Sequence, residues 1–162
     1  MSEKFYKCVS FKDGKLVPIF GNKDFIYQKG LNIDIEEFNP NGECQKGGLY
    51  CCKLKELHKW YQSNCRILEA IIPENAQVYE EQDKYKTDKL FVERIWESLE
   101  FAEYLIENDM KSGAQLTLQI GATYNRLDIC EWAVEKGAND FNEALRYTYN
   151  PNIIAFLKEC MH

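Results

Sequence analysis

Three segments in the C-terminal half of the chain repeat one pattern. They are LEFAEYLIE at 99–107, LDICEWAVE at 127–135 and PNIIAFLKE at 151–159. Each has an acidic residue or Asn at its second position, an apolar residue at its third and an aromatic residue at its sixth. Spacings of 28 and 24 residues fit a helix, a turn and a second short helix per unit, which buries its apolar stripe only against its neighbours. Stacked helical repeats usually bind proteins, so the repeat predicts an interaction protein without identifying its partner.

The first half of the chain has the pattern of short strands between turns. The predicted strands are KFYKCVSF, KLVPIFG, GGLYCC, CRILEAIIP and KTDKLFVERI, all rich in β-branched, aromatic and leucine residues. Asp13-Gly14 predicts a tight hairpin turn between the first two strands. The apolar spacing in KLKELHKWYQ predicts one short helix, and residues 30–46 are expected to form a long loop.

The second half is predicted to be helical throughout. An apolar face at Phe91, Ile95, Leu99, Ala102 and Ile106 indicates the start of a long helix. Gly113 and Gly137 are expected at helix C-termini, and Asn150-Pro151 is expected to end one helix and begin the next. We therefore expect an α+β fold in which a strand-rich α/β domain, 1–92, packs on a short stack of helix pairs, 93–162.

Composition indicates a folded protein that is neither exported nor embedded in a membrane. Hydrophobic residues make up 45% of the chain and charged residues 28%, which is typical of a protein with a real core. No apolar run approaches the roughly 18 residues that span a bilayer, and MSEKFYKC lacks the apolar stretch of a secretory signal. We expect a cytoplasmic protein.

The net charge of −6 lies entirely in the second half. Residues 1–92 carry 14 acids and 14 bases, whereas residues 93–162 carry 12 acids and 6 bases. Nucleic-acid affinity depends mainly on neutralised phosphates, so an acidic repeat surface argues against DNA or RNA as its ligand. A basic or apolar protein surface is the expected partner.

The seven cysteines favour reduced thiols without a cofactor or metal. A zinc site would use Cys44, Cys51, Cys52, His58 and Cys65, but the chain has no CxxC pair. Cys51 and Cys52 precede the helix that carries His58, a position that can lower a thiol pKa and activate a nucleophile. The alternative, which we favour, is that cysteines such as Cys51, Cys65 and Cys130 are small buried hydrophobes.

Two parts of the chain resemble a known family. FNPNGECQKGGLYCC, with KGLNID before it and AQVYEEQDKYKTDKL after it, resembles the N-terminal domain of ankyrin-repeat proteins of mimivirus-like giant viruses of amoebae. LDICEWAVEKGAND is similar to the second helix of an ankyrin repeat and the turn after it. The resemblance implies degenerate ankyrin-like repeats that bind a host or viral protein in the host-cell cytoplasm.

The repeats also depart from the ankyrin pattern. The Thr-Pro-Leu-His opening of a standard repeat is missing, and the period is shorter than the usual value of about 33 residues. Shorter units leave little room for projecting β-hairpin loops. We therefore expect bare helix pairs, with the strand-rich half as their N-terminal cap.

One alternative function comes from the region around GGLY. Lys29-Gly30-Leu31 and Gly48-Leu49-Tyr50 are similar to segments of ADP-ribosyltransferases of the polymerase type, which use NAD. That resemblance implies a histidine on an early strand and a glutamate on a late strand. The early histidine is absent, since the chain has only His58 and His162, and the late glutamate would be Glu93. We accordingly expect no catalysis.

Four residues are the candidates for protein binding. Tyr, Trp and Arg dominate interface energetics, and such residues lie at the joints of the repeats: Arg126, Arg146, Tyr147 and Tyr149. Each also has a structural interpretation, because Tyr124 and Tyr149 both precede an asparagine, as expected in a recurring turn. The repeat's aromatic residues Tyr104, Trp132 and Phe156 are expected to pack between helices.

Overall fold

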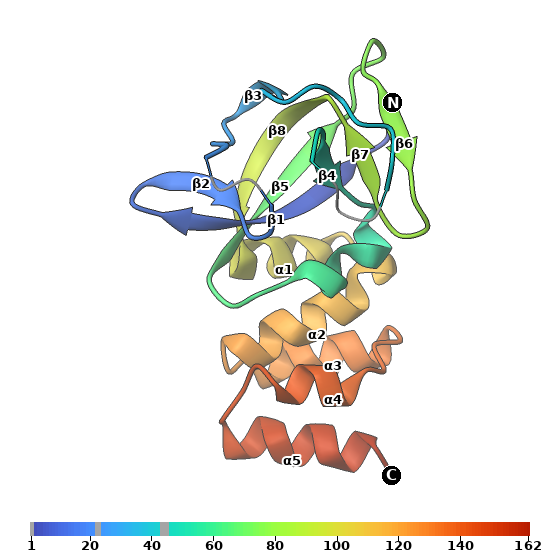
Figure 1. The fold of residues 1–162 in the computed structure, drawn as a ribbon. Coiled ribbons are helices and arrows are strands. Elements are labelled where there is room, and N and C mark those ends of the chain that lie inside the picture. The colour runs from blue at the N-terminus through green and yellow to red at the C-terminus, as the bar shows by residue number, and fades with distance from the viewer. Residues whose placement is uncertain (1, 22–23, 43–45) are drawn as a thin grey trace. The chain divides into compact units, whose positions relative to one another are not determined.

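The computed structural model describes residues 2–21, 24–42 and 46–162 and has an α+β fold (Figure 1). Helices account for 35% of the chain and strands for 28%. The chain forms two compact units, residues 1–97 and 98–162, which we call the strand unit and the helical unit. The predicted domain boundary between residues 92 and 93 therefore falls inside the last strand.

The strand unit contains a five-stranded antiparallel sheet in the order β2-β1-β5-β8-β3. Its strands are β1 (Phe5–Lys12), β2 (Lys15–Pro18), β3 (Gly30–Ile33), β5 (Cys65–Ile71) and β8 (Lys89–Glu97). Asp13 and Gly14, both with positive φ, form the predicted two-residue hairpin turn between β1 and β2. Residues 30–33 form a strand, so the prediction of a continuous loop over 30–46 was wrong there.

A second sheet in the strand unit has three antiparallel strands in the order β4-β7-β6. These are β4 (Leu49–Cys51), β6 (Val78–Glu80) and β7 (Tyr85–Thr87). The predicted short helix after β4 is a 3-10 helix, η1 (Leu54–Trp60). An isolated bridge between Tyr6 and Cys52 joins β1 to the end of β4.

The core of the strand unit draws on both sheets. β1, β5 and β8 place alternate apolar side chains on one face, as the two-residue period of a strand requires. These side chains pack with Leu49 and Cys51 of β4 and with Phe25 and Tyr27 from the segment before β3.

The predicted start of the helical half needs a correction. Residues 89–97 are the strand β8 and not the first turns of a helix, because β5 pairs with one edge of β8 and β3 with the other. Phe91 and Ile95, which were predicted to share an apolar helix face, lie on the exposed side of this strand. Leu90 and Val92 on its other side are fully buried. The first helix begins at Ser98.

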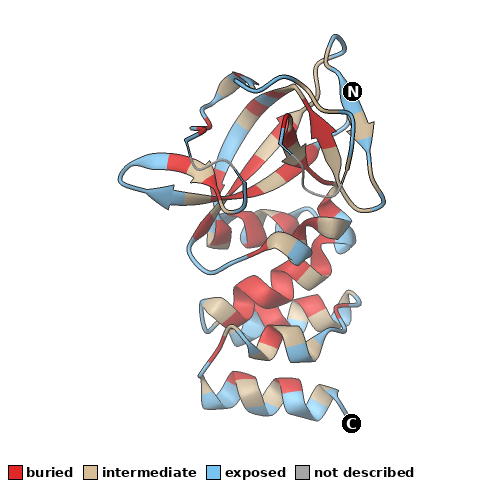
Figure 2. Cartoon of the chain, in the orientation of Figure 1, coloured by how far each residue is buried: buried red, intermediate tan, exposed pale blue. Residues whose placement is uncertain are grey.

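The helical unit has five α-helices within the described residues, and each repeated segment is one of them. They are α1 (Ser98–Glu107), α2 (Ala114–Thr123), α3 (Leu127–Glu135), α4 (Phe141–Leu145) and α5 (Pro151–Cys160), with the 3-10 turn η2 (Lys111–Gly113) before α2. The three repeats are α1, α3 and α5. Helix α2 is buried along most of its length (Figure 2). At Gly121 of α2, an added Cβ would come within 2.9 Å of Cys130 Sγ on α3, so glycine permits this close helix contact.

Three helices of this unit end in the same motif. After α1, α2 and α3 the chain takes a positive φ at Asp109, Asn125 and Gly137, respectively. In each case the next amide donates to a carbonyl five residues back, at 2.9 Å: Met110 to Leu105, Arg126 to Gly121 and Ala138 to Ala133. This is the Schellman arrangement, which satisfies carbonyls left over at a helix end. The prediction for Gly137 is confirmed, but that for Gly113 was wrong, because Gly113 precedes α2 with a negative φ.

Among the described residues, no helix combines the length and the apolar character needed to cross a bilayer.

Candidate functional site

The four predicted binding residues lie at two neighbouring turns of the helical unit. Arg126 is in the turn between α2 and α3, and the other three lie between α4 and α5. Thr148 Oγ1 donates to Asn125 Oδ1 at 3.4 Å, which places the two turns side by side. Figure 1 shows both turns at the same edge of the unit. We call the exposed part of this edge, formed by Tyr124, Arg126, Leu127, Arg146 and Tyr149, the turn surface.

Tyr149 is the most exposed large side chain of the turn surface. It is 98% exposed, although the backbone on both sides of it is held in place. The Asn150 amide donates to Thr148 Oγ1 at 3.0 Å, and Asn150 Oδ1 caps α5 by accepting from the amides of Asn152 and Ile153. An aromatic ring therefore projects into solvent from an ordered turn.

The two arginines are already paired with carboxylates of their own turns. Arg126 donates from Nε and Nη2 to the two carboxylate oxygens of Asp128, at 3.0 and 2.9 Å. This guanidinium lowers the pKa of Asp128. Arg146 Nη1 contacts both carboxylate oxygens of Glu143 at 3.0 Å. The pairs orient the guanidinium groups but leave less of their charge for a partner.

Tyr147 differs from the other three because its ring packs against the core of the helical unit. Its hydroxyl donates to Glu143 Oε1 at 3.3 Å. The position of Tyr147 is therefore explained largely by a structural role within the helical unit. Sequence patterns did not point to Leu127, which is 36% exposed, and indicated only a turn role for Tyr124, which is 38% exposed. The available signal was the position of both residues beside Asn125 and Arg126.

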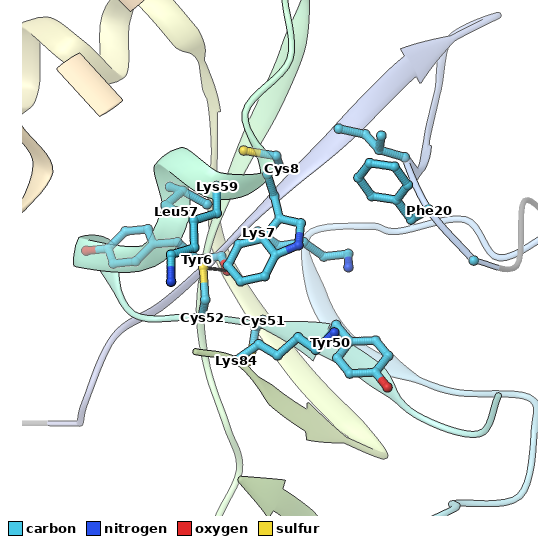
Figure 3. A pocket seen from close by; sticks show the side chains of 13 residues that line it. Tyr6, Lys7, Cys8, Phe20, Tyr50, Cys51, Cys52, Leu57, Lys59 and Lys84 are labelled. Atoms are coloured by element: carbon cyan, nitrogen blue, oxygen red, sulfur yellow. Dashed lines mark hydrogen bonds between the residues drawn. The ribbon is translucent and has the colours of Figure 1, made fainter. Parts of the chain in front are cut away.

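The strand unit contains a separate cavity of about 500 Å³ (Figure 3). The cavity lies beside β1, the end of β4 and η1. Its lining consists of Tyr6, Lys7, Cys8, Ile19, Phe20, Gly21, Tyr50, Cys51, Cys52, Leu57, Lys59, Trp60 and Lys84. The walls are mainly aromatic, aliphatic and thiol side chains, and the charged residues of this lining are three lysines.

Lys7 occupies an inward position of β1. It shares a face of the strand with Phe5 and Val9, both buried in the core, and is itself only partly exposed. Its ammonium lies 5.5 Å from the centre of the Tyr27 ring. Burial lowers the pKa of this ammonium, and the neighbouring charge of Lys84 lowers it further, while nearby thiols act in the opposite direction.

The other two lysines of the cavity have different surroundings. Lys84 Nζ lies 4.6 Å from the centre of the Tyr50 ring, within the range of a cation–π contact. Lys59 Nζ pairs with Glu56 at 2.7 Å and with Asp83 at 3.6 Å. Lys59 is therefore neutralised locally, whereas Lys7 and Lys84 place positive charge beside aromatic rings.

The residues of the transferase alternative are distributed over different elements. Tyr50 lies on β4 and lines the cavity, whereas Gly30 and Leu31 lie on β3 of the other sheet. Glu93 lies on β8, forms an ion pair with Lys4 and is not part of the cavity lining.

The described cysteines of the strand unit, and Cys130 of α3 in the helical unit, are buried thiols. Cys51, Cys65 and Cys130 are all buried, which confirms their interpretation as small hydrophobes. Burial raises the pKa of Cys51 to about 12, opposite to the lowering that a nucleophile needs. Cys44, a member of the alternative zinc set, lies outside the described residues. Within residues 2–21, 24–42 and 46–162, no three or more His, Cys, Asp or Glu residues are grouped as metal ligands.

Comparisons of the chain with protein-family models, with curated proteins and with solved structures found no match.

Proposed function

We propose that this chain is a non-catalytic protein-binding module whose helical unit contacts its partner through the turn surface. The observation that carries the proposal is the 98% exposure of Tyr149 on a turn held by hydrogen bonds from Asn150 and to Asn125. A tyrosine presents a large contact area with few rotatable bonds, which is why tyrosine is frequent among the residues that dominate interface energetics.

The fixed backbone of the turn that carries Tyr149 supports this role. A side chain whose backbone is already fixed loses little conformational entropy on binding, so more of its contact energy contributes to affinity. Tyr124 and Leu127 add apolar area on the neighbouring turn. Arg126 and Arg146 form the polar part of the surface, and their pairing with Asp128 and Glu143 makes their expected contribution smaller than that of Tyr149.

The charge of the helical unit favours one class of partner. Residues 98–162 carry ten acids and five bases, so the unit repels nucleic acid and attracts basic surfaces. The proposed partner is a protein with an apolar pocket for Tyr149 and a basic or neutral rim. In this proposal the helix pairs are degenerate ankyrin-like repeats of a giant-virus protein, and the partner is a host or viral protein in the host-cell cytoplasm.

Site-specific photo-crosslinking tests the proposal. A benzophenone amino acid replaces Tyr149 in one variant and the exposed Lys158 of α5 in a matched control, both in cells that make the full chain. We expect a discrete crosslinked protein with the first variant, absent with the second and lost when Leu127 is also changed to Ser. Identical crosslinks at both positions, or none at position 149, would contradict the proposal.

The enzymatic alternative has its own test. Calorimetry of the reduced, full-length protein with NAD is expected to give no binding heat. Micromolar NAD binding that disappears in Tyr50→Ala would favour a transferase-like strand unit over a module without catalysis.

A further inference from the structure

We propose that the cavity of the strand unit binds a flat organic anion: an aromatic ring system that carries one carboxylate, sulfonate or phosphate group. This site is independent of the turn surface, because all its lining residues belong to the strand unit.

The position of Lys7 favours an anionic ligand. The pattern of β1 places it on the core-facing side, where Phe5 and Val9 are fully or almost fully buried. In the described part of the chain, no hydrogen bond or ion pair engages its ammonium. Burying an ammonium without an anionic partner is costly, so such a group is found where something else supplies the opposite charge. An anionic group in the cavity would do so.

The sign of the charge around the cavity also favours an anion. Its described lining contains three lysines but no aspartate or glutamate. Lys59 is paired with Glu56 and Asp83, whereas Lys7 and Lys84 both lie beside aromatic rings. These two lysines are close enough to repel each other, because the charge of Lys84 lowers the pKa of Lys7. A bound anion relieves this repulsion, whereas a metal cation would increase it.

The rest of the cavity wall fits a flat apolar body. Tyr50 and Trp60 supply rings, and Phe20 is 64% exposed although it lines the cavity. Aromatic side chains favour stacked or edge-on contacts with another ring. The volume of about 500 Å³ lies within the range of small-molecule sites and is too small for a macromolecule. The raised pKa of the Cys51 thiol makes a covalent thiolate adduct unfavourable, so the inferred binding is reversible.

The probe for this site is 1-anilinonaphthalene-8-sulfonate, an aromatic anion that fluoresces when it leaves water. We expect saturable binding at one site on the folded full-length protein. The uncharged analogue N-phenyl-1-naphthylamine should bind about tenfold or more weakly, because it lacks the group that pairs with the lysines.

Three variants assign the binding to the cavity. Lys7→Met and Lys84→Gln are each expected to weaken binding of the sulfonate about tenfold. Lys12→Met, on the exposed end of the same strand, should leave binding unchanged. Near-ultraviolet circular dichroism confirms that each variant is folded, and Lys84→Gln remains decisive if Lys7→Met does not fold, because Lys84 lies in the turn between β6 and β7. Equal affinity for both dyes, or no effect of either cavity variant, would overturn the proposal.

Competition identifies the preferred anionic group. Displacement of the dye by 2-naphthoate alone would assign a carboxylate ligand, and displacement by adenosine 5′-monophosphate alone would assign a phosphate ester. Either result supports the site. The proposal would be contradicted if uncharged 2-naphthamide displaced the dye as efficiently as 2-naphthoate does. It would also be contradicted if neither anion displaced the dye. None of these outcomes affects the crosslinking test at Tyr149, so the two proposals fail separately.

Discussion

The two units of this protein obtain their structure from interactions of very different range along the chain. In the strand unit, β1 pairs with β5, and β5 pairs with β8, so the central sheet joins residues 5–12 to residues 65–71 and 89–97. In the helical unit, most helix contacts join neighbours in the chain, such as α2 with α3 and α4 with α5. The repeat unit therefore forms from local signals, whereas the sheet forms only when distant segments meet.

The largest predicted effect tests this difference with matched substitutions of two fully buried leucines. Leu68→Ala in β5 and Leu157→Ala in α5 should each lower the free energy of unfolding by about 3 kcal/mol, through lost burial and the cavity left behind. Hydrogen exchange should show lost protection across β1, β5 and β8 for Leu68→Ala, since β5 is central in the sheet. For Leu157→Ala the loss should be greatest in α4 and α5. Equal loss of protection throughout the chain for both variants would contradict the difference between the two units.

The next effect concerns the one inward lysine of β1. Lys7→Met should raise the free energy of unfolding at pH 7 by about 1 kcal/mol, because an ammonium is removed from a core-facing position. Burial makes the pKa of Lys7 lower in the folded than in the unfolded state. As pH rises through the window below 10.5, the unfolded state keeps more protons, so the stability of the natural protein should rise.

The advantage of Lys7→Met should therefore shrink between pH 7 and pH 10 when urea unfolding is measured at both. Lys12→Met is the control, because Lys12 is exposed on the same strand. A constant advantage of Lys7→Met at both pH values would show that the effect comes from packing and not from charge.

An effect of similar size but opposite sign is expected at the cap of the last helix. Asn150→Ala should lower stability by about 1 kcal/mol, because the amides of Asn152 and Ile153 lose their shared acceptor. Thermal unfolding followed by circular dichroism measures the change. Asn152 is exposed and lies two residues further along the chain, so Asn152→Ala should leave the stability unchanged. A similar loss for both variants would mean that Asn150 Oδ1 is not the stabilising group.

The smallest effect compares helix ends within the helical unit. Gly137→Asn should cost only about 0.5 kcal/mol, because Asn125 already takes a positive φ in the same motif after α2. Gly137→Val should cost more, since a β-branched residue does not tolerate this conformation. Chemical denaturation of both variants tests whether Gly137→Val loses more stability than Gly137→Asn. Equal losses would show that the three helix ends are not equivalent.

Much of the helical unit could be predicted from the sequence, because its structure depends on signals that are local in the chain. The three repeated segments correspond to α1, α3 and α5, and Asn150-Pro151 and Gly137 lie where a helix begins or ends. Gly113 was misplaced because Asp109 supplied the positive φ after α1, and aspartate is a weaker signal than glycine. The turns that carry Arg126 and Tyr149 could be located, but not their contact through Asn125 and Thr148, which lie 23 residues apart.

The strand unit shows where sequence patterns are insufficient. The spacing of Phe91, Ile95 and Leu99 is compatible with a helix, yet pairing with both β5 and β3 makes residues 89–97 a strand. The cavity also escaped prediction, because Lys7, Tyr50 and Lys84 belong to segments that meet only in the folded unit. A lysine between Phe5 and Val9 was a visible signal, since it interrupts an otherwise apolar alternation.

The amino-acid sequence was sufficient to predict the mixed fold class, the hairpin at Asp13-Gly14, the three repeated helices and the acidic character of the helical half. These features depend on residues close together in the chain, where turn chemistry, periodicity and charge act directly. The strand order, the end of β8, the exposure of Tyr149 and the cavity around Lys7 depend instead on the folded structure. Each of these depends on which distant segments pair and on what they leave uncovered, because burial and hydrogen bonding between segments override local preference.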